Sequence, residues 1–141
     1  ARIGIRAMAV FDANVLVGLI VDLAWSDRAR DSVAAESVRT APSLLAVEVG
    51  NAIWRNVRSG ALSADQAGRA LTHAIAIVAL EPVEDLAAQA LRIAIERDHP
   101  VYDCCYVALA MRDSVPLVTA DRRLAALAEQ AGVTVEMLAT G

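Results

Sequence analysis

Four acidic side chains interrupt apolar segments at positions where the neighbouring residues predict burial. Asp12 directly follows the apolar run "MAVF", and Asp121 follows "PLVTA" in the same way. Glu48 lies within "SLLAVEVGNAIW", and Asp103 lies near the start of "YDCCYVALAM". Burying a carboxylate without a partner is costly, and carboxylates that are packed together repel one another. If the fold brings these side chains together, they require a shared partner of positive charge.

A divalent cation is the partner that best fits this set. Carboxylate oxygens, with water in the remaining positions, suit Mg²⁺ or Mn²⁺, and no His or Cys accompanies the acids at zinc spacing. We therefore predict that the metal ligands, which are also catalytic residues, are Asp12, Glu48, Asp103 and Asp121. Such an ion activates water and stabilises charge on a phosphate, so phosphodiester hydrolysis is the expected reaction. The Thr119 hydroxyl is expected to bind a phosphate oxygen or a water on the metal, and Asn14 to do the same or to hold Asp12.

Alternating strand and helix patterns place the acids at a common edge. Short apolar runs predict strands at residues 8–12, 39–42, 78–83, 116–120 and 133–138. Helical patterns occur between them, at 14–21, 27–38, 43–58, 63–78, 84–98, 103–112 and 122–131. This order indicates one α/β domain, with a parallel Rossmann-like sheet of about four to five strands and helices on both faces. Sites in such sheets form beyond the carboxyl ends of the strands, where Asp12 and Asp121 lie.

Local signals predict several helix ends and faces. Ser43 is expected to cap a helix that runs to about residue 58, and Gly60 to end it. Ser63 and Gln66 form a capping-box pattern at the start of the next helix. The periodicity of residues 84–98 predicts a buried helix face made up of Leu86, Ala90, Leu91, Ala94 and Ile95.

The acidic segments resemble the motifs of a nuclease family. "VFDANVLV", "LLAVEVGNAIW", "YDCCYVALA" and "LVTADRRL" occur in the order and spacing of the PIN-domain family, and look most like its VapC-type toxin ribonucleases. The resemblance covers essentially the whole chain from Met8 onward; its last motif is quite specific, and the middle two are weak alone. It implies Mg²⁺-dependent cleavage of RNA, a homodimer, and a cognate antitoxin that blocks the site. The family's functional positions fall on Asp12, Glu48, Asp103, Asp121 and, for the hydroxyl, Thr119.

The antitoxin is expected to occupy a groove beside the acids. This groove is predicted to be lined by "VLVGLIVDLAW", residues 15–25, and by the helix after Ser43. Leu19 and Trp25 are the residues expected to contact the partner, although Trp25 can also be read as a core residue. The pair Cys104–Cys105 departs from the small, apolar residues common after the family's third acid, and is interpreted as helix packing.

Each acid has a simpler interpretation when it is taken alone. Asp103 and Asp121 can cap the helices that they precede, and Asp12 can be a turn residue after its strand. Glu48 can be a solvated helix residue. Their joint occurrence in one order favours the metal site over these separate interpretations.

Other polar residues near the motifs carry weaker signals. His73 and His99 are interpreted as structural or exposed, because nothing in the sequence places either near the acids. The remaining basic candidates either contact RNA phosphates or are ordinary solvated helix residues: Arg55, Arg58, Arg122 and Arg123.

Composition narrows the class of protein. The 141 residues are 57% hydrophobic with a net charge of −4, which excludes a basic protein that coats nucleic acid. A receiver domain is excluded because it needs paired acids after its first strand and a lysine, and the chain has no Lys. Two alternatives stay open: a PIN nuclease of RNA maturation outside toxin–antitoxin systems, and an inactive PIN-fold binding module.

The remaining expectations concern location and chain ends. The two cysteines are adjacent, so no disulfide framework is possible and a reducing, cytoplasmic location is expected. No apolar segment near the start is long enough to span a membrane. The PIN domain is expected over residues 8–141, because Met8 is a natural start. Residues 1–7 are then an extension, either vector-derived or native chain that has lost its initiator.

Overall fold

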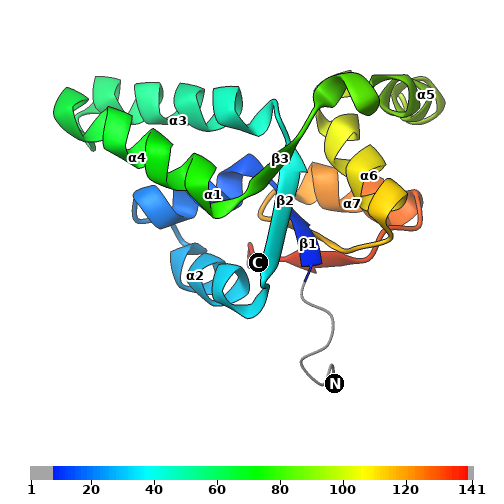
Figure 1. Cartoon of the computed structure of the whole chain (residues 1–141), viewed down its shortest axis with the longest axis horizontal. Helices are drawn as coiled ribbons and strands as arrows, with labels where there is room; N and C mark the ends of the chain where they lie inside the picture. The colour runs from blue at the N-terminus through cyan, green and yellow to red at the C-terminus, as the bar shows by residue number, and fades with distance from the viewer. Residues whose placement is uncertain (1–7, 140–141) are drawn as a thin grey trace.

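The computed structural model describes residues 8–139 and contains a five-stranded parallel sheet in the order β3–β2–β1–β4–β5 (Figure 1). The strands are β1 (Met8–Phe11), β2 (Val38–Pro42), β3 (Ala79–Glu81), β4 (Leu117–Thr119) and β5 (Val135–Met137). The helices are α1 (Ala13–Ile20), α2 (Ser26–Ala35), α3 (Leu45–Ser59), α4 (Ala64–Ile77), the 3-10 helix η1 (Val83–Asp85), α5 (Ala87–Arg97), α6 (Val101–Asp113) and α7 (Arg122–Gln130). The predicted α/β domain with a parallel sheet is confirmed.

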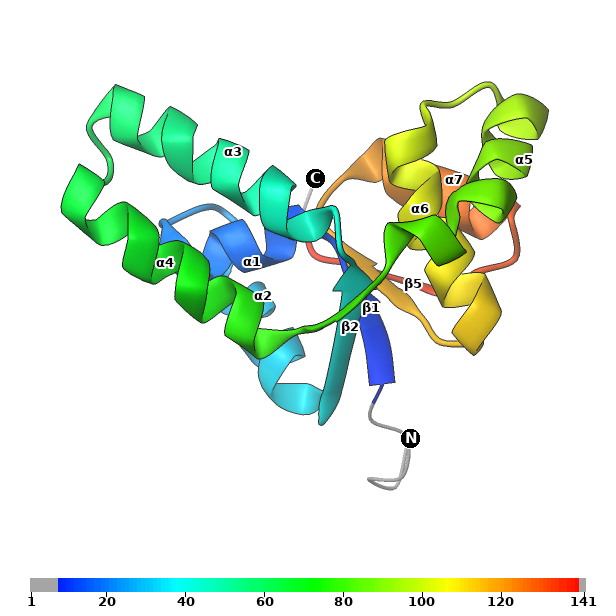
Figure 2. The same ribbon diagram turned by 45° about the horizontal axis from the view of Figure 1, so that its top comes forward.

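Successive strand residues belong to two apolar clusters, one on each face of the sheet. Val10 and Leu117 pack with residues of α3, α5 and α6, whereas Phe11 and Val118 pack with Ala29 of α2. This alternation follows from the two-residue period of a strand, and both faces of a parallel sheet must be covered. In the view of Figure 2, α3 and α4 lie to the left of β2, and α5 and α6 lie to its right.

The strand register determines which residues meet at the carboxyl edge. β1 lies next to β4, with Phe11 paired to Val118. The residues that follow this pair are Asp12 and Thr119, so the two side chains leave neighbouring strands at the same level. The sheet therefore brings two of the predicted site residues together before any helix contributes.

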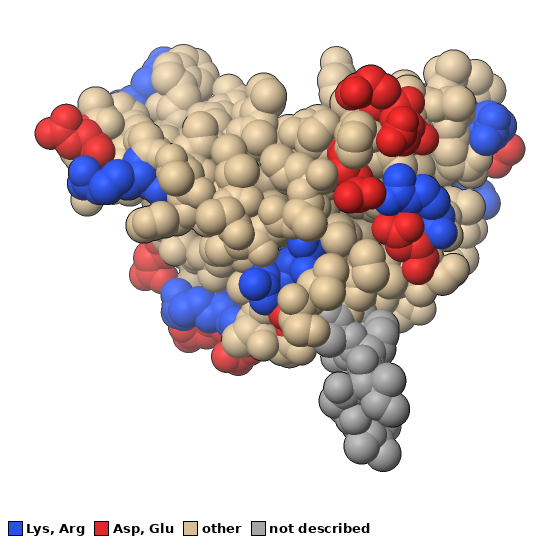
Figure 3. All heavy atoms as spheres, viewed as in Figure 1, with Lys and Arg blue, Asp and Glu red and all other residues tan. Residues whose placement is uncertain are grey.

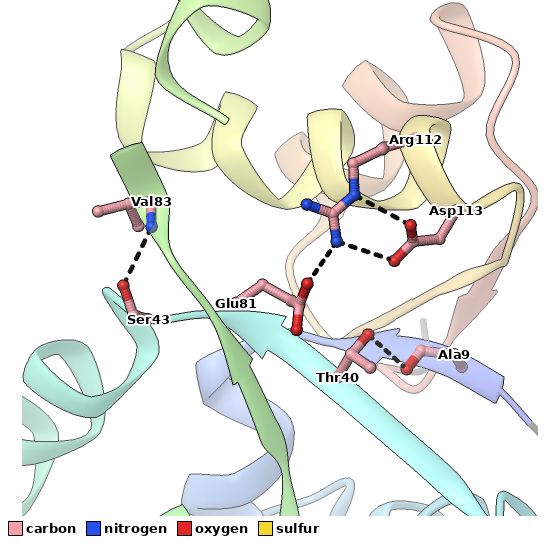
Figure 4. A network of polar contacts seen from close by, with 7 residues as sticks. All are labelled: Ala9, Thr40, Ser43, Glu81, Val83, Arg112 and Asp113. Carbon is pink, nitrogen blue, oxygen red and sulfur yellow. Dashed lines mark hydrogen bonds and ion pairs between the residues drawn. The ribbon is translucent and has the colours of Figure 1, made fainter. Parts of the chain in front are cut away.

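The predicted N-cap of α3 is wrong. Leu44 occupies that position without a side-chain hydrogen bond, whereas the Ser43 hydroxyl accepts a hydrogen bond of 3.2 Å from the amide of Val83 (Figure 4). β2 and β3 run side by side and end near Ser43, so the hydroxyl satisfies a backbone donor beyond the end of β3. Local sequence cannot reveal this competing partner, which lies 40 residues away.

The other predicted helix ends, at Gly60 and Ser63, are confirmed. Gly60 ends α3 with a φ of 86°, a left-handed conformation that favours glycine. Ser63 and Gln66 form both hydrogen bonds of a capping box at the start of α4.

The buried face of α5 is narrower than predicted. Leu86, Ala90 and Ile93 are buried, but Leu91 is 50% exposed and Ile95 is 73% exposed. Leu86, Ala90 and Ile93 are spaced by about one helical turn each and form a single stripe. Because α5 packs chiefly on α6, a second apolar stripe has no neighbour to cover it. The prediction that Leu91 and Ile95 are buried is therefore wrong.

Surface charges are distributed without a continuous basic face in the view of Figure 3, where acidic and basic groups form small, separate patches. Arg112 binds Glu81 at 2.5 Å and Asp113 at 3.0 Å (Figure 4). The contact with Glu81 joins the end of α6 to the edge strand β3. Both contacts are solvent-accessible, and ion pairs of this kind stabilise a fold only weakly.

The predicted extension, residues 1–7, lies outside the described part of the chain. Within residues 8–139, no helix has the length and apolar character needed to cross a membrane.

Candidate active site

All four predicted acids line one cavity at the carboxyl edge of the sheet. The cavity has a volume of about 850 Å³, and its walls come from α1, the segment after α1, α3 and the first turn of α6. The acids in its lining are Asp12, Glu48, Asp103 and Asp121. The structure thus brings together side chains from the ends of two strands and from two helices.

Asp12 is the most constrained of the acids. Its Oδ1 accepts a hydrogen bond of 2.7 Å from the amide of Ala13, so it caps α1, and its Oδ2 accepts one of 2.7 Å from Thr119 Oγ1. The residue is only 7% exposed. Burial, and to a smaller extent the charge of Glu48, raises the pKa of Asp12 from 3.8 to about 7, although the Thr119 hydrogen bond opposes the rise.

Thr119 acts on the site through its neighbours. Its hydroxyl is fully buried, donates to Asp12, and accepts a 2.9 Å hydrogen bond from the amide of Asp121. Thr119 does not line the cavity, and its hydroxyl proton is donated to Asp12, so its contact with a phosphate or with a water on the metal stays a prediction. The side chain of Asn14 does not hold Asp12, since its Oδ1 accepts a 3.2 Å hydrogen bond from the amide of Ala120 and fixes the turn after β4.

Glu48 is held by a residue that the sequence did not single out and that does not itself line the cavity. Tyr106 of α6 is fully buried, and its hydroxyl lies 2.6 Å from Glu48 Oε1. Burial and the nearby carboxylates raise the pKa of Tyr106 well above its usual value, so the phenol keeps its proton and donates. Burial, followed by the charge of Asp103, raises the pKa of Glu48, whereas the Tyr106 hydrogen bond lowers it.

Asp103 has a histidine partner. His99 Nε2 lies 2.8 Å from Asp103 Oδ2, and the His99 side chain is 8% exposed. The interpretation that nothing places His99 near the acids is therefore wrong. The two residues are four positions apart on either side of Pro100, and the turn into α6 closes that distance. His73, in contrast, is exposed on α4 and does not line this cavity.

Asp121 caps α7, as the simpler interpretation proposed. Its Oδ1 accepts hydrogen bonds from the amides of Arg123, at 2.9 Å, and Leu124, at 3.3 Å. The same side chain lines the cavity. The cap and the site are compatible, because the hydrogen bonds orient the carboxylate at the edge where the other acids lie.

The donor set suits a hard cation. It consists of carboxylate oxygens, and each of the four carboxylates is oriented by at least one hydrogen bond. Among residues 8–139, no three acidic, imidazole or thiol groups stand close enough to enclose an ion by themselves. Mg²⁺ does not need such a cage, since it keeps several waters and is commonly held by one or two carboxylates. The residues therefore fit a hydrated Mg²⁺ or Mn²⁺.

One wall of the cavity is apolar, and we call it the apolar wall. It is formed by Val17, Val21, Leu23, Trp25, Leu44 and Val47. Trp25 is partly buried, and its indole N–H donates a hydrogen bond of 3.1 Å to the carbonyl oxygen of Asn14. Leu19 does not belong to this wall, because it faces a separate cavity between α1 and α4. The prediction that Leu19 lines the groove beside the acids is therefore wrong, while its contact with an antitoxin stays a prediction. Both predicted segments, residues 15–25 and the helix after Ser43, contribute residues to the cavity lining.

The remaining candidates divide between the cavity and other surfaces. Arg55 lines the cavity, whereas the Arg58 guanidinium lies 4.8 Å from the centre of the Trp54 ring. The two other arginines singled out in the sequence, Arg122 and Arg123, are exposed at the start of α7. Cys104 and Cys105 are buried free thiols, as expected for packing residues.

Comparison with known proteins gives the family to which most of the chain is similar. The sequence model of the PIN domain matches residues 9–130. Ribonuclease VapC3 of Pyrobaculum aerophilum is 30% identical over 82% of this chain and 91% of its own length. Ribonuclease VapC1 of Mycobacterium tuberculosis is 35% identical over 83% of this chain and 88% of its own length.

Solved structures share the fold. PAE2754 from Pyrobaculum aerophilum has a TM-score of 0.68 and 24% identity, and the match covers 92% of this chain and 83% of that one. A toxin–antitoxin complex from Klebsiella pneumoniae has a TM-score of 0.60 and 20% identity, and the match covers 84% and 90% of the two chains.

Proposed function

The chain belongs to the PIN-domain family, within its VapC branch, and from this premise we propose that it is a metal-dependent endoribonuclease that acts as the toxin of a toxin–antitoxin pair. The observation that carries the proposal is the meeting of Asp12, Glu48, Asp103 and Asp121 around one cavity. Both curated relatives are named ribonucleases, and their matches cover most of each chain.

The acids would hold Mg²⁺ or Mn²⁺ at the carboxyl edge of the sheet. The bound ion would supply an activated water and would stabilise the negative charge that develops on the scissile phosphate. Asp12 is the best-positioned ligand, because two hydrogen bonds fix its carboxylate and burial excludes competing water. Asp103 and Asp121 complete the acidic rim that attracts the ion.

A carboxylate must also receive the proton that the attacking water loses. We assign this role to Glu48, because a raised pKa makes a carboxylate a better base near neutral pH. The water oxygen then bonds to phosphorus, the bond to the leaving ribose oxygen breaks, and that oxygen takes up a proton. The Tyr106 hydrogen bond keeps Glu48 oriented while it accepts and releases the proton.

The partner would be a cognate antitoxin that occupies the apolar wall. Val47 is 76% exposed there, although it is apolar, and such surface next to an active site suits an inhibitory protein segment. The Klebsiella structure is a toxin–antitoxin complex with this fold, which supports a partner of this kind. We further propose that the chain forms a homodimer, which light scattering of the purified protein would test.

Cleavage of RNA with defined metal content tests the proposed function. The parent protein should cut single-stranded RNA in Mg²⁺ and should be inactive in EDTA. Asp12→Asn should abolish cleavage, while the exposed control Asp27→Asn on α2 should not. Undiminished cleavage in EDTA, or by Asp12→Asn, would refute the metal-dependent mechanism.

A further inference from the structure

An exposed aromatic ring stands at the rim of the acidic cavity. Tyr102 lies in the first turn of α6, directly before Asp103, and it lines the cavity. It is 70% exposed, and it forms no hydrogen bond with any residue in the described part of the chain. Exposing most of an aromatic ring without a partner leaves apolar surface in water, so neither packing nor hydrogen bonding within the fold accounts for this side chain.

A cation lies in the same cavity lining, on the α3 wall. Arg55 is two helical turns after Glu48, and it is the one basic residue among the described residues that line the cavity. Its guanidinium is exposed and forms no ion pair or hydrogen bond within residues 8–139. An arginine on the same cavity as four carboxylates, yet bound to none of them, remains available to an anion that enters from solvent.

We propose that Tyr102 and Arg55 form a subsite for one unpaired nucleotide of the RNA, in which the ring stacks on the base and the guanidinium binds an adjacent phosphate. This inference rests on the proposed function and deepens it. Unpaired bases can be splayed out so that their faces are free to stack. Proteins bind single-stranded RNA by stacking bases on aromatic side chains and by contacting phosphates with basic groups such as arginine. The subsite would place the neighbouring phosphodiester bond over Asp103.

The charge of the cavity favours RNA binding that involves Arg55 over RNA binding at the acids alone. The chain has a net charge of −4, and four of its carboxylates line the cavity, so the field there repels RNA unless a positive group compensates. Arg55 supplies a fixed positive charge at the site itself. A stacked base adds affinity that does not depend on charge, and it would make unpaired nucleotides the preferred target.

A fluorescent base reports stacking directly. An unpaired oligoribonucleotide that contains 2-aminopurine, and the same strand in a duplex, are titrated with protein in EDTA. KM and kcat for RNA cleavage are then measured in Mg²⁺. Tyr102→Ala should lose the quenching of 2-aminopurine and weaken binding by roughly 5- to 100-fold, whereas Tyr102→Phe should retain both. Arg55→Gln should weaken binding and reduce its salt dependence by about one phosphate contact.

Matched controls lie on α3 outside the cavity. Trp54→Ala and Arg58→Gln remove the same types of side chain from exposed positions that do not line it, and neither should change binding. If the parent cleaves RNA but Tyr102→Ala keeps the parental quenching and KM, the subsite is refuted and the proposed function stands. The subsite would also be refuted if the duplex bound as tightly as the unpaired strand. The same would hold if Tyr102→Ala changed only dimer formation or the affinity for the antitoxin. A parent protein that neither binds nor cleaves RNA would refute both proposals.

Discussion

The hydroxyl of Tyr106 on α6 donates a hydrogen bond of 2.6 Å to Oε1 of Glu48 on α3, a residue 58 positions earlier in the chain. The contact joins the two helices that approach the acidic cavity from opposite sides. Because the phenol is fully buried, water cannot easily replace it as a donor. The bond therefore orients Glu48 and connects the site to the core.

Tyr106→Phe should weaken metal binding without unfolding the domain. Removing the hydroxyl leaves Glu48 free to rotate, and loss of such an orienting contact typically lowers metal affinity by about 10- to 100-fold. Calorimetric titration with Mn²⁺ measures this affinity. The control is Tyr102→Phe, the same chemical change at an exposed position of the same helix. Equal Mn²⁺ affinities for the parent and Tyr106→Phe would show that the hydroxyl only packs.

His99→Gln should lower kcat for RNA cleavage by about 10-fold, since Asp103 loses the side chain that holds Oδ2 at 2.8 Å. Initial rates at saturating RNA measure kcat. His73→Gln makes the same change on the exposed face of α4 and should leave kcat unchanged. A rate for His99→Gln equal to that of His73→Gln would show that Asp103 needs no support from the imidazole.

The strand-end acids were predictable from the sequence because their neighbours determine their positions. A buried strand that ends in Asp12 or Asp121 leaves the carboxylate at the sheet edge whatever the helices do, and both residues cap the helix that follows. The capping box at Ser63 was also predictable, because both partners lie within four residues.

Contacts between distant segments could not be predicted in this way. The 58-residue separation of Tyr106 and Glu48 leaves no periodic signal, and within "YDCCYVALAM" Tyr106 cannot be told from the packing residues around it. The contact between His99 and Asp103 is a local one, since the two residues are four positions apart. Its prediction was prevented by Pro100, because the sequence did not show whether one helix contains both residues. The prediction that Ser43 caps α3 failed because its hydroxyl accepts a hydrogen bond from the distant amide of Val83 instead of a local one.

Val47→Asp should weaken the complex with the cognate antitoxin by about 10-fold or more, because the complex would bury a charge in the apolar wall. Surface plasmon resonance with the purified antitoxin measures the Kd. Ile95→Asp is the control, since Ile95 is similarly exposed, at 73%, but lies on α5 outside the cavity. An unchanged Kd for Val47→Asp would place the antitoxin elsewhere on the surface.

Removing the metal should lower the melting temperature of the parent protein. A ligand that binds only the folded state stabilises it in proportion to the logarithm of its concentration over Kd. Mg²⁺ should therefore raise the melting temperature of the parent more than that of Asp103→Asn, which lacks one ligand. Thermal unfolding in EDTA and in Mg²⁺ measures both shifts. Identical shifts for the two proteins would remove Asp103 from the ligand set.

Asp12→Asn should make the metal-free protein more stable at neutral pH while it abolishes cleavage. The pKa of Asp12 is raised from 3.8 to about 7, chiefly by burial, so the folded state binds this proton more tightly than the unfolded chain. The stability that results is fully present below pH 3.8, is lost as the pH rises towards about 7, and changes no further above it. Asparagine has the same shape, can still accept the amide hydrogen bond of Ala13, and has no charge to bury. The melting temperature of the variant should therefore rise relative to that of the parent between pH 4 and pH 7, and the difference should then level off. Each kcal/mol of difference in the free energy of unfolding corresponds to about 3 °C. Melting curves in EDTA across this pH range measure the difference, and the control Asp31→Asn, at an exposed position of α2, should show none. A variant that melts below the parent at pH 8 would mean that the ionised carboxylate stabilises the fold, and Asp12 would then be a structural cap rather than a metal ligand held in a costly state.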